Sequence, residues 1–236
     1  PLLEVSVYLT AVIAEHSSYA RDAILSFGLY EFLIQIAQSE VNEQLTIQAC
    51  EALHKIFSNR TPIEASILKS CVPQMASLFS LHSIQAVNIV LLCFVQMTNK
   101  SNALVFTIYD EGLFPTIVSM LNNEDLYASA LPLIGNISVG NSEHISTLLN
   151  CDLFQSLMKL LTSEYTADVF WVLSNLVEST PHLTISLFNT EFIAQAVDMA
   201  LSSPFEVRRE STFFLATLII FTSIDDLTYF VTEDVL

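Results

Sequence analysis

The sequence predicts an all-α solenoid made of repeated helical units, and three observations indicate it. Apolar segments with helical spacing recur about every 41 residues, and no stretch alternates apolar and polar residues over a length typical of a strand. Of the 236 residues, 52% are hydrophobic, whereas only 4 are glycine and 7 are proline. Stacked repeats that share one continuous core account for this apolar content.

The repeat is defined by five segments that align without gaps. They are residues 27–37, 70–80, 111–121, 151–161 and 190–200, whose third residues are Leu29, Val72, Leu113, Leu153 and Phe192. A second helical segment follows each one in the same phase, at residues 48–59, 88–99, 128–140, 168–179 and 208–220, and a sixth, residues 3–15, comes before the first. A further helix precedes the aligned start, as at residues 101–111 and 142–150, so the unit contains three helices.

A period of about 40 to 47 residues is typical of HEAT and armadillo solenoids, and three helices per unit favour armadillo. We therefore expect one right-handed superhelical solenoid of about five to six repeats over residues 1–236. The chain begins directly in a helical pattern without an initiator methionine, so we interpret it as a fragment of a longer protein.

Composition argues against several classes of protein. The chain carries 8 Lys and Arg against 25 Asp and Glu, and a formal charge of −17 disfavours binding to nucleic acid or anionic lipid. The longest uncharged apolar runs, residues 86–97 and 213–221, fall short of the roughly 18 to 20 residues that span a bilayer. No phosphate-binding loop, nucleophile elbow, paired carboxylates or metal-ligand spacing occurs, so we expect neither an enzyme nor a cofactor or metal site.

The four cysteines lie in apolar runs and are too widely spaced for a zinc site, so they favour buried, reduced thiols. They are Cys50, Cys71, Cys93 and Cys151.

Three columns of the aligned third helices lie on one helical face, since offsets of three, four and seven residues recur on the same side. The first column contains Ala11, Lys55, Gln96, Asn136, Asn175 and Thr217. The column four residues earlier contains Val7, Glu51, Leu92, Pro132, Trp171 and Phe213. The column seven residues earlier contains Glu4, Gln48, Ile89, Ser129, Asp168 and Glu210. Because this face is polar for a core helix, we expect it to line the concave surface.

The third helices resemble those of importin-α, an armadillo adaptor in which Trp and Asn four residues apart recur along the inner groove. "FWVLSN" at 170–175 matches the Trp-x-x-x-Asn helix of that family. "ALPLIGNISVG" at 130–140 is similar to the family helix that carries arginine in the tryptophan's place, and residues 208–231 resemble the repeats that follow. These motifs cover about residues 126–217, which correspond to the minor, C-terminal signal-binding site of the family.

The resemblance implies an extended basic peptide, a nuclear localisation signal, held along an acidic groove. Asparagine amides would bond the peptide main chain, aromatic rings would pack on Lys or Arg stems, and acids would supply counter-charge. The implied peptide-binding residues are Asn136, Asp168, Trp171, Ser174, Asn175, Glu210 and Phe213. The implied partners are basic signal-bearing cargo, an importin-β-type carrier and an export factor for recycling, with shuttling between cytoplasm and nucleus.

The sequence also departs from the family pattern, which leaves other interpretations open. Pro132 replaces the family's arginine, Glu51 and Leu92 replace stacking aromatics, and Lys55 places a cation where a basic peptide would lie. We therefore predict that basic signals avoid the first half of the groove. The alternative is a general armadillo scaffold that binds another, more apolar protein segment.

Each single residue also has a structural interpretation. Trp171 could belong to the core, either Phe213 or Phe214 must do so, and Asn136 could close a neighbouring loop. Asp168 and Glu210 could be solvated acids near the start of a helix, where the helix dipole favours them.

Overall fold

The computed structural model describes residues 2–224 and 228, and within these residues every regular element is a helix. This confirms the predicted all-α class. The chain packs into two compact units. The N-terminal unit comprises residues 1–116 and 123–136, and the C-terminal unit comprises residues 117–122 and 137–236.

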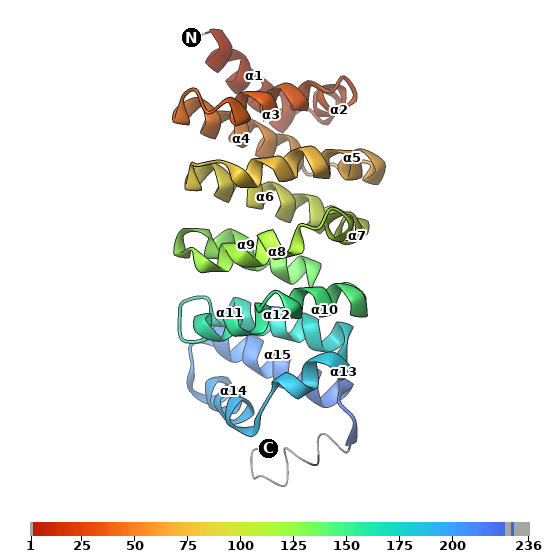
Figure 1. The fold of residues 1–236 in the computed structure, drawn as a ribbon, viewed down its shortest axis with the longest axis vertical. Helices are drawn as coiled ribbons and strands as arrows, with labels where there is room; N and C mark the ends of the chain where they lie inside the picture. Colours follow the sequence, from red (N-terminus) through yellow and green to blue (C-terminus); the bar gives the residue numbers. More distant parts are fainter. Residues whose placement is uncertain (1, 225–227, 229–236) are drawn as a thin grey trace. The chain divides into compact units, whose positions relative to one another are not determined.

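The N-terminal unit stacks the third helices of consecutive repeats, α1 on α4 and α4 on α6 (Figure 1). These third helices are α1 (Leu2–His16), α4 (Glu43–Ser58), α6 (Ile84–Lys100) and α9 (Tyr127–Ile137), the last of which leaves the unit after Asn136. The first and second helices are α2 (Ser18–Ser26), α3 (Leu29–Ser39), α5 (Ala65–Ala76) with the 3-10 turn η1 (Ser77–Ser80), and α7 (Ala103–Asp110). The predicted third helices are thus confirmed here.

Three short elements follow α7: α8 (Phe114–Ser119), η2 (Met120–Asn122) and η3 (Glu124–Leu126). Most of α8 and all of η2 belong to the C-terminal unit, whereas η3 belongs to the N-terminal unit. The C-terminal unit then contains α10 (Ser142–Asn150), α11 (Leu153–Leu160), α12 (Thr166–Ser179), α13 (Pro181–Thr184), η4 (Ile185–Leu187), α14 (Thr190–Ser202) and α15 (Phe205–Phe221). The third helices α12 and α15 pack against each other, and α14 packs on α15. Of the family-like segment 208–231, residues 225–227 and 229–231 lie outside the described residues.

In three of the repeats, a residue with a left-handed backbone separates the first and second helices. Gly28 and Gly112 have φ of 67°, and Asp152, at the same place in its repeat, has φ of 59°. Glycine adopts this conformation without steric cost, so it ends one helix and allows the next to start in a new direction. In the second repeat the aligned residue is Cys71, which lies within a helix, so the two expected helices merge into α5. The prediction of three helices in every repeat was wrong there.

Side-chain caps mark where several helices begin. Ser17, Asn42, Ser83, Asn141 and Asn189 each accept a hydrogen bond from a backbone N–H in the first turn of the helix that follows. Such a cap satisfies one of the donors that the first turn leaves without a partner within the helix. The polar breaks between the apolar segments therefore determine where the repeats turn.

Each unit has its own apolar core. In the N-terminal unit Phe94 is fully buried and stacks on Phe79 with ring centroids 4.9 Å apart. In the C-terminal unit four buried phenylalanines form one cluster, with neighbouring centroids 5.2 to 6.4 Å apart: Phe170 of α12, Phe188 just after η4, Phe192 of α14 and Phe214 of α15. Cys50, Cys71 and Cys93 are buried free thiols as predicted, whereas Cys151 is partly exposed.

Two cations hold the turn after α4. The guanidinium of Arg21, fully buried, donates to the carbonyl oxygens of Thr61 and Pro62 and pairs with Asp22 at 2.6 Å. Lys100, at the end of α6, donates to the carbonyl oxygens of Phe57 and Asn59. Burial, followed by the charge of Arg21, lowers the pKa of Lys100 to about 8. The turn is therefore fixed by donors from the repeats on either side of it.

Within the described residues, no single helix has both the length and the hydropathy of a transmembrane span. One pair of helical segments, Ala103–Asp110 and Phe114–Asn122, passes this test when taken together, with a bend of 92° between them.

Candidate functional site

The candidate site lies on the outward face of α12. Asp168 is exposed, and Trp171 and Asn175, one and two turns further along, are partly exposed. The residues between them, Phe170 and Val172 among them, are buried. The helix thus turns one mixed acidic, aromatic and amide face outward and its apolar face into the core, as the 3.6-residue period requires.

Helix α15 adds an acid and an aromatic ring to the same unit. Glu210 is partly exposed and Phe213 is exposed, whereas Phe214 is fully buried in the phenylalanine cluster. The choice that the sequence left open between Phe213 and Phe214 is therefore decided by the structure: Phe214 is the core residue. Because α12 and α15 pack together, the acids of the two helices influence each other.

The electrostatics of this face favour a cation. Although the Asp168 residue is exposed, neighbouring groups partly desolvate its carboxyl, and this desolvation, followed by the negative charge of Glu210, raises the pKa of Asp168 above its usual value. Glu210 itself pairs with Arg209 at 2.8 Å, and Arg209 also pairs with Glu206 at 2.7 Å. A positive group placed beside Asp168 and Glu210 would relieve their mutual repulsion, while an additional anion would increase it.

Ser174 does not lie where the resemblance implied. It is buried, and its hydroxyl donates to the carbonyl oxygen of Phe170 at 2.8 Å. Thr217, in the asparagine column of α15, is likewise buried, and its hydroxyl donates to the carbonyl oxygen of Phe213 at 2.9 Å. A residue next to Asn175 is rotated by about 100° around the helix, which carries Ser174 into the core. Ser174 is therefore withdrawn from the predicted peptide-binding residues.

Asn136 belongs to the N-terminal unit and is engaged within it. Its amide nitrogen donates to the hydroxyl of Thr98 at 2.9 Å and to the side-chain oxygen of Asn99 at 2.8 Å, both at the end of α6. The structure thus matches the alternative that Asn136 closes a neighbouring turn. An amide nitrogen held in this way must break these bonds before it can donate to a peptide main chain.

The N-terminal unit has a groove of its own, of about 710 Å³, between α1, α4 and α6. Its lining includes five residues of the predicted columns: Ala11, Glu51, Lys55, Ile89 and Leu92. These third-helix residues therefore line a hollowed surface, as expected from their shared helical face. The composition of this groove differs from that of the α12–α15 face, because Glu51 and Leu92 occupy the column positions that Trp171 and Phe213 occupy in α12 and α15.

Lys55 is not an isolated charge in this groove. Its ammonium pairs with the carboxylate of Glu15 at 2.7 Å. Glu15 was not among the predicted groove residues, although it is one turn beyond Ala11, the residue that occupies the position of Lys55 one repeat earlier. The two residues meet because their third helices, α4 and α1, stack directly on each other. Tyr8 and His54 also line the groove and were not predicted.

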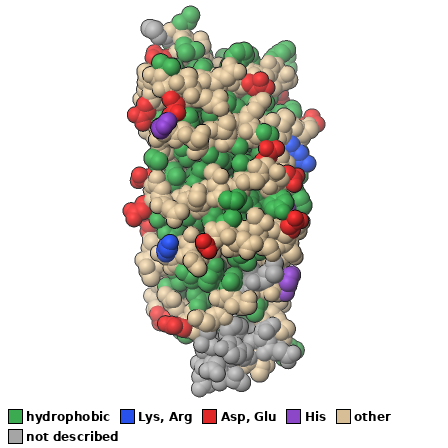
Figure 2. Space-filling view, viewed as in Figure 1, with side chains coloured by type: hydrophobic (Ala, Val, Ile, Leu, Met, Phe, Trp, Pro, Cys, Tyr) green, Lys and Arg blue, Asp and Glu red, His purple; other side chains and the backbone are tan. Residues whose placement is uncertain are grey.

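Acidic side chains are scattered over the visible face, while Lys and Arg are sparse on it (Figure 2). Over the part of the chain that the structure describes, no group of three or more His, Cys, Asp or Glu could hold a metal ion.

No protein-family model matches this chain, and no curated protein matches it. Solved structures do match it. A designed armadillo repeat protein in complex with the peptide (KR)4 gives a TM-score of 0.76 at 16% identity, over 90% of this chain and 91% of that one. A computationally designed armadillo repeat protein for modular peptide recognition gives 0.77 at 15% identity, over 91% and 92% of the two chains. A third designed armadillo repeat protein gives 0.75 at 16% identity, over 91% and 92%. The chain therefore has an armadillo-like repeat fold.

Proposed function

We propose that this protein is a peptide-binding scaffold whose α12–α15 face holds a Lys- or Arg-rich extended segment, and that it acts as a nuclear-import adaptor. The observation that carries the proposal is the pair of acids, Asp168 and Glu210, on packed helices that also expose Trp171 and Phe213. Two acids and two aromatic rings form a site suited to long cationic side chains.

Each residue has a distinct part in this proposal. The ring of Trp171 packs on the aliphatic stem of a Lys or Arg and attracts its charged end, a contribution of about 0.5 to 2 kcal/mol. Asn175, one turn along, offers a donor and an acceptor to the main chain of the peptide. Asp168 and Glu210 supply the counter-charge, and Phe213 packs a second stem.

The binding of a cation would also change the titration of Asp168. Partial desolvation, followed by the charge of Glu210, raises the pKa of Asp168 in the free protein, and a bound Lys or Arg would lower it again. The bound state therefore favours the ionised form of Asp168. Affinity for a basic peptide should rise with pH through the titration range of this carboxyl and level off above it.

The structural neighbours give the proposal limited support. One designed protein with the same fold was solved with an alternating Lys and Arg peptide, and another was designed for modular peptide recognition. An armadillo solenoid can thus present a surface to such peptides. The net charge of −17 in this chain would attract the same kind of ligand over a longer range.

The test is a titration of labelled (KR)4 peptide at low and high salt. We expect Asp168→Asn with Glu210→Gln to weaken binding by about tenfold or more, and high salt to weaken binding by the native protein. Glu178→Gln is the matched control for Asp168→Asn made alone, because each removes one exposed acid from helix α12. Equal loss in the control would mean that net charge, and not this face, attracts the peptide.

The proposed role in nuclear import is tested by an import assay in permeabilised cells. As an adaptor, the protein would link basic signal-bearing cargo to an importin-β-type carrier, enter the nucleus and return with an export factor. A fluorescent cargo with a basic signal should accumulate in the nuclei of permeabilised cells only when both this protein and the carrier are supplied. Accumulation that is the same without this protein would exclude the role and leave peptide binding intact.

A second candidate function rests on the groove between α1, α4 and α6. Ile89 and Leu92 form an apolar part of its lining, and the pair of Lys55 and Glu15 lies beside it. This composition favours a segment with apolar side chains over a purely basic one. In that case the protein is a general scaffold, and an apolar peptide should compete with (KR)4 poorly, because the two would occupy different units.

A further inference from the structure

The acid that α15 contributes to the α12–α15 face is already paired with a cation of the same helix. Nε of Arg209 donates to Oε1 of Glu210 at 2.8 Å, and Nη2 of Arg209 lies 2.8 Å from the same oxygen. On its other side, Nη1 of Arg209 lies 2.7 Å from Oε2 of Glu206. The guanidinium thus bridges two carboxylates that are one helical turn apart. Its hydrogen bonds with Glu210 raise the pKa of Arg209, so the guanidinium stays charged.

The acid of α12 has no such partner. Desolvation, followed by the charge of Glu210, raises the pKa of Asp168, and no cation of the described residues lowers it. The repeat alignment explains the difference, because the position of Arg209 carries no cation in the other third helices. Its equivalents are Leu3, Ile47, Asn88, Ala128 and Ala167. The bound cation is therefore a feature of α15 and not of the repeat pattern.

Arg209 is the outer partner of its pair with Glu210. The side chain of Arg209 is 55% exposed, whereas that of Glu210 is 16% exposed. An ammonium or guanidinium group that approaches Glu210 from solvent is repelled by Arg209 and must also take over its bonds. Exposed ion pairs are weak, so a ligand can displace Arg209, but the displacement reduces the affinity.

We propose that Arg209 is a specificity-determining residue, which occupies the cation position at Glu210 in the free protein. The position at Asp168 and Trp171 is then open to a basic side chain, and the position at Glu210 and Phe213 opens only when Arg209 turns away. This inference rests on the proposed function of the face in binding basic peptides. Its consequence is a lower affinity for ligands that place cations at both positions.

The test compares two neighbouring arginines by anisotropy of labelled (KR)4 peptide. Arg209→Gln should strengthen binding by about threefold or more, the range that an exposed ion pair can account for. Arg208→Gln is the matched control, because it removes the same charge from an exposed residue of α15. Arg208 and Glu210 are two residues apart and do not face each other, so the control should change the affinity little. Arg209→Lys keeps a cation and should restore the lower affinity.

A double-mutant cycle identifies the acid through which Arg209 acts. In a Glu210→Gln background, the gain from Arg209→Gln should fall to that from Arg208→Gln, because no carboxylate remains to be released. An equal gain with and without Glu210 would mean that Arg209 acts only through net charge, and it would overturn the proposal. Weaker binding by Arg209→Gln would also overturn it, since Arg209 would then help to hold the ligand. Circular dichroism checks that all variants are folded.

Asp168→Asn distinguishes failure of this inference from failure of the proposed function. If Asp168→Asn weakens binding but Arg209→Gln behaves as Arg208→Gln does, the peptide uses the face and the inference alone is wrong. If Asp168→Asn binds as the native protein does, or if no variant binds, both are wrong. Binding by Arg209→Gln and not by the native protein, with loss when Asp168→Asn is added, would support the inference and contradict the proposed function.

Discussion

Two neighbouring aromatic residues of α12 provide a sharp test of the candidate site. Trp171 is partly exposed on the outward face, and Phe170, next to it, is fully buried. We expect Phe170→Ala to reduce the stability of the fold and Trp171→Ala to reduce mainly the affinity for basic peptides. The pair is matched, because both residues are aromatic and share one helix.

The structure gives the expected magnitudes. The ring of Phe170 lies 5.6 Å from that of Phe214 and 6.4 Å from that of Phe192, so its removal leaves a closed cavity and should cost about 3 to 5 kcal/mol. The space left by Trp171 opens to water, so no cavity term arises. Truncation loses only part of the roughly 1.5 to 3 kcal/mol that full burial of a large side chain contributes, or about 1 to 2 kcal/mol. The free energies of unfolding of the two variants should then differ by roughly 2 to 3 kcal/mol, which for a chain of this length corresponds to roughly 4 to 12 °C in melting temperature.

Tryptophan fluorescence reports on Trp171 alone, because it is the only tryptophan in the 236 residues. Its emission in the native protein can be quenched by acrylamide, and saturating (KR)4 peptide should protect it. Far-UV circular dichroism gives the melting temperatures of both variants. Anisotropy of labelled peptide gives their affinities, and Trp171→Ala should bind at least about fivefold more weakly if packing and cation attraction contribute about 1 kcal/mol.

Two results would refute this reasoning. A melting temperature for Trp171→Ala as low as that of Phe170→Ala would place the indole in the core. Peptide affinity that is unchanged in a folded Trp171→Ala protein would remove the tryptophan from the binding face, whatever the stability shows. Neither result would affect the repeat fold, which depends on the apolar positions of every helix.

Individual contacts lead to four further predictions. Partial desolvation, followed by the charge of Glu210, raises the pKa of Asp168, so the folded protein holds that proton more tightly than the unfolded chain does. Stability should therefore fall as pH rises from the unfolded to the folded pKa, and Asp168→Asn should raise the melting temperature at neutral pH while it weakens the binding of basic peptides. Arg21→Met should cost about 1.5 to 3 kcal/mol in a denaturant titration, since it removes charged hydrogen bonds to two carbonyl groups, and a loss below about 0.5 kcal/mol would show that the turn does not need them. The pKa of Lys100, lowered to about 8, means that the folded protein releases this proton before the unfolded chain does; stability should rise with pH from about 8 toward the unfolded value, and Lys100→Met should abolish this slope. Asn136→Ala should cost about 1 to 2 kcal/mol and leave the affinity of (KR)4 unchanged, whereas a lower affinity at unchanged stability would restore its role as a peptide clamp.

The sequence determined the repeat itself, because the positions that are buried in each repeat carry apolar residues at a regular spacing. Apolar positions such as Leu29, Val72 and Leu153 recur since each repeat must cover its neighbour, and their phase marked which residues of the third helices face outward. Gly28 and Gly112 likewise mark turns that need a left-handed backbone. Period and phase are local properties, so one sequence was enough to place Trp171, Asn175 and Asp168 on one side of a helix.

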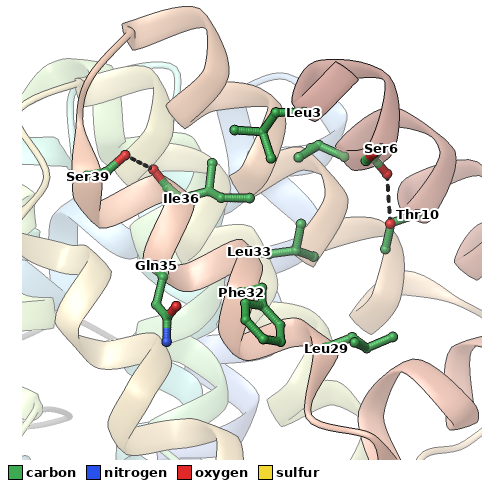
Figure 3. A pocket seen from close by; sticks show the side chains of 10 residues that line it. Leu3, Ser6, Thr10, Leu29, Phe32, Leu33, Gln35, Ile36 and Ser39 are labelled. Atoms are coloured by element: carbon green, nitrogen blue, oxygen red, sulfur yellow. Dashed lines mark hydrogen bonds between the residues drawn. The ribbon is translucent and has the colours of Figure 1, made fainter. Parts of the chain in front are cut away.

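What the sequence left open was decided by contacts between repeats. The assignment of Phe214 to the core, the pairing of Lys55 with Glu15 and the engagement of Asn136 by Thr98 all depend on residues about 40 positions apart, or on which side of a helix meets the next one. Helical spacing says that two residues share a face, but it does not say what packs against that face. Only the stacked repeats show that Ser174 is turned inward and that Leu3, Leu29 and Phe32 surround a space that no described helix fills (Figure 3).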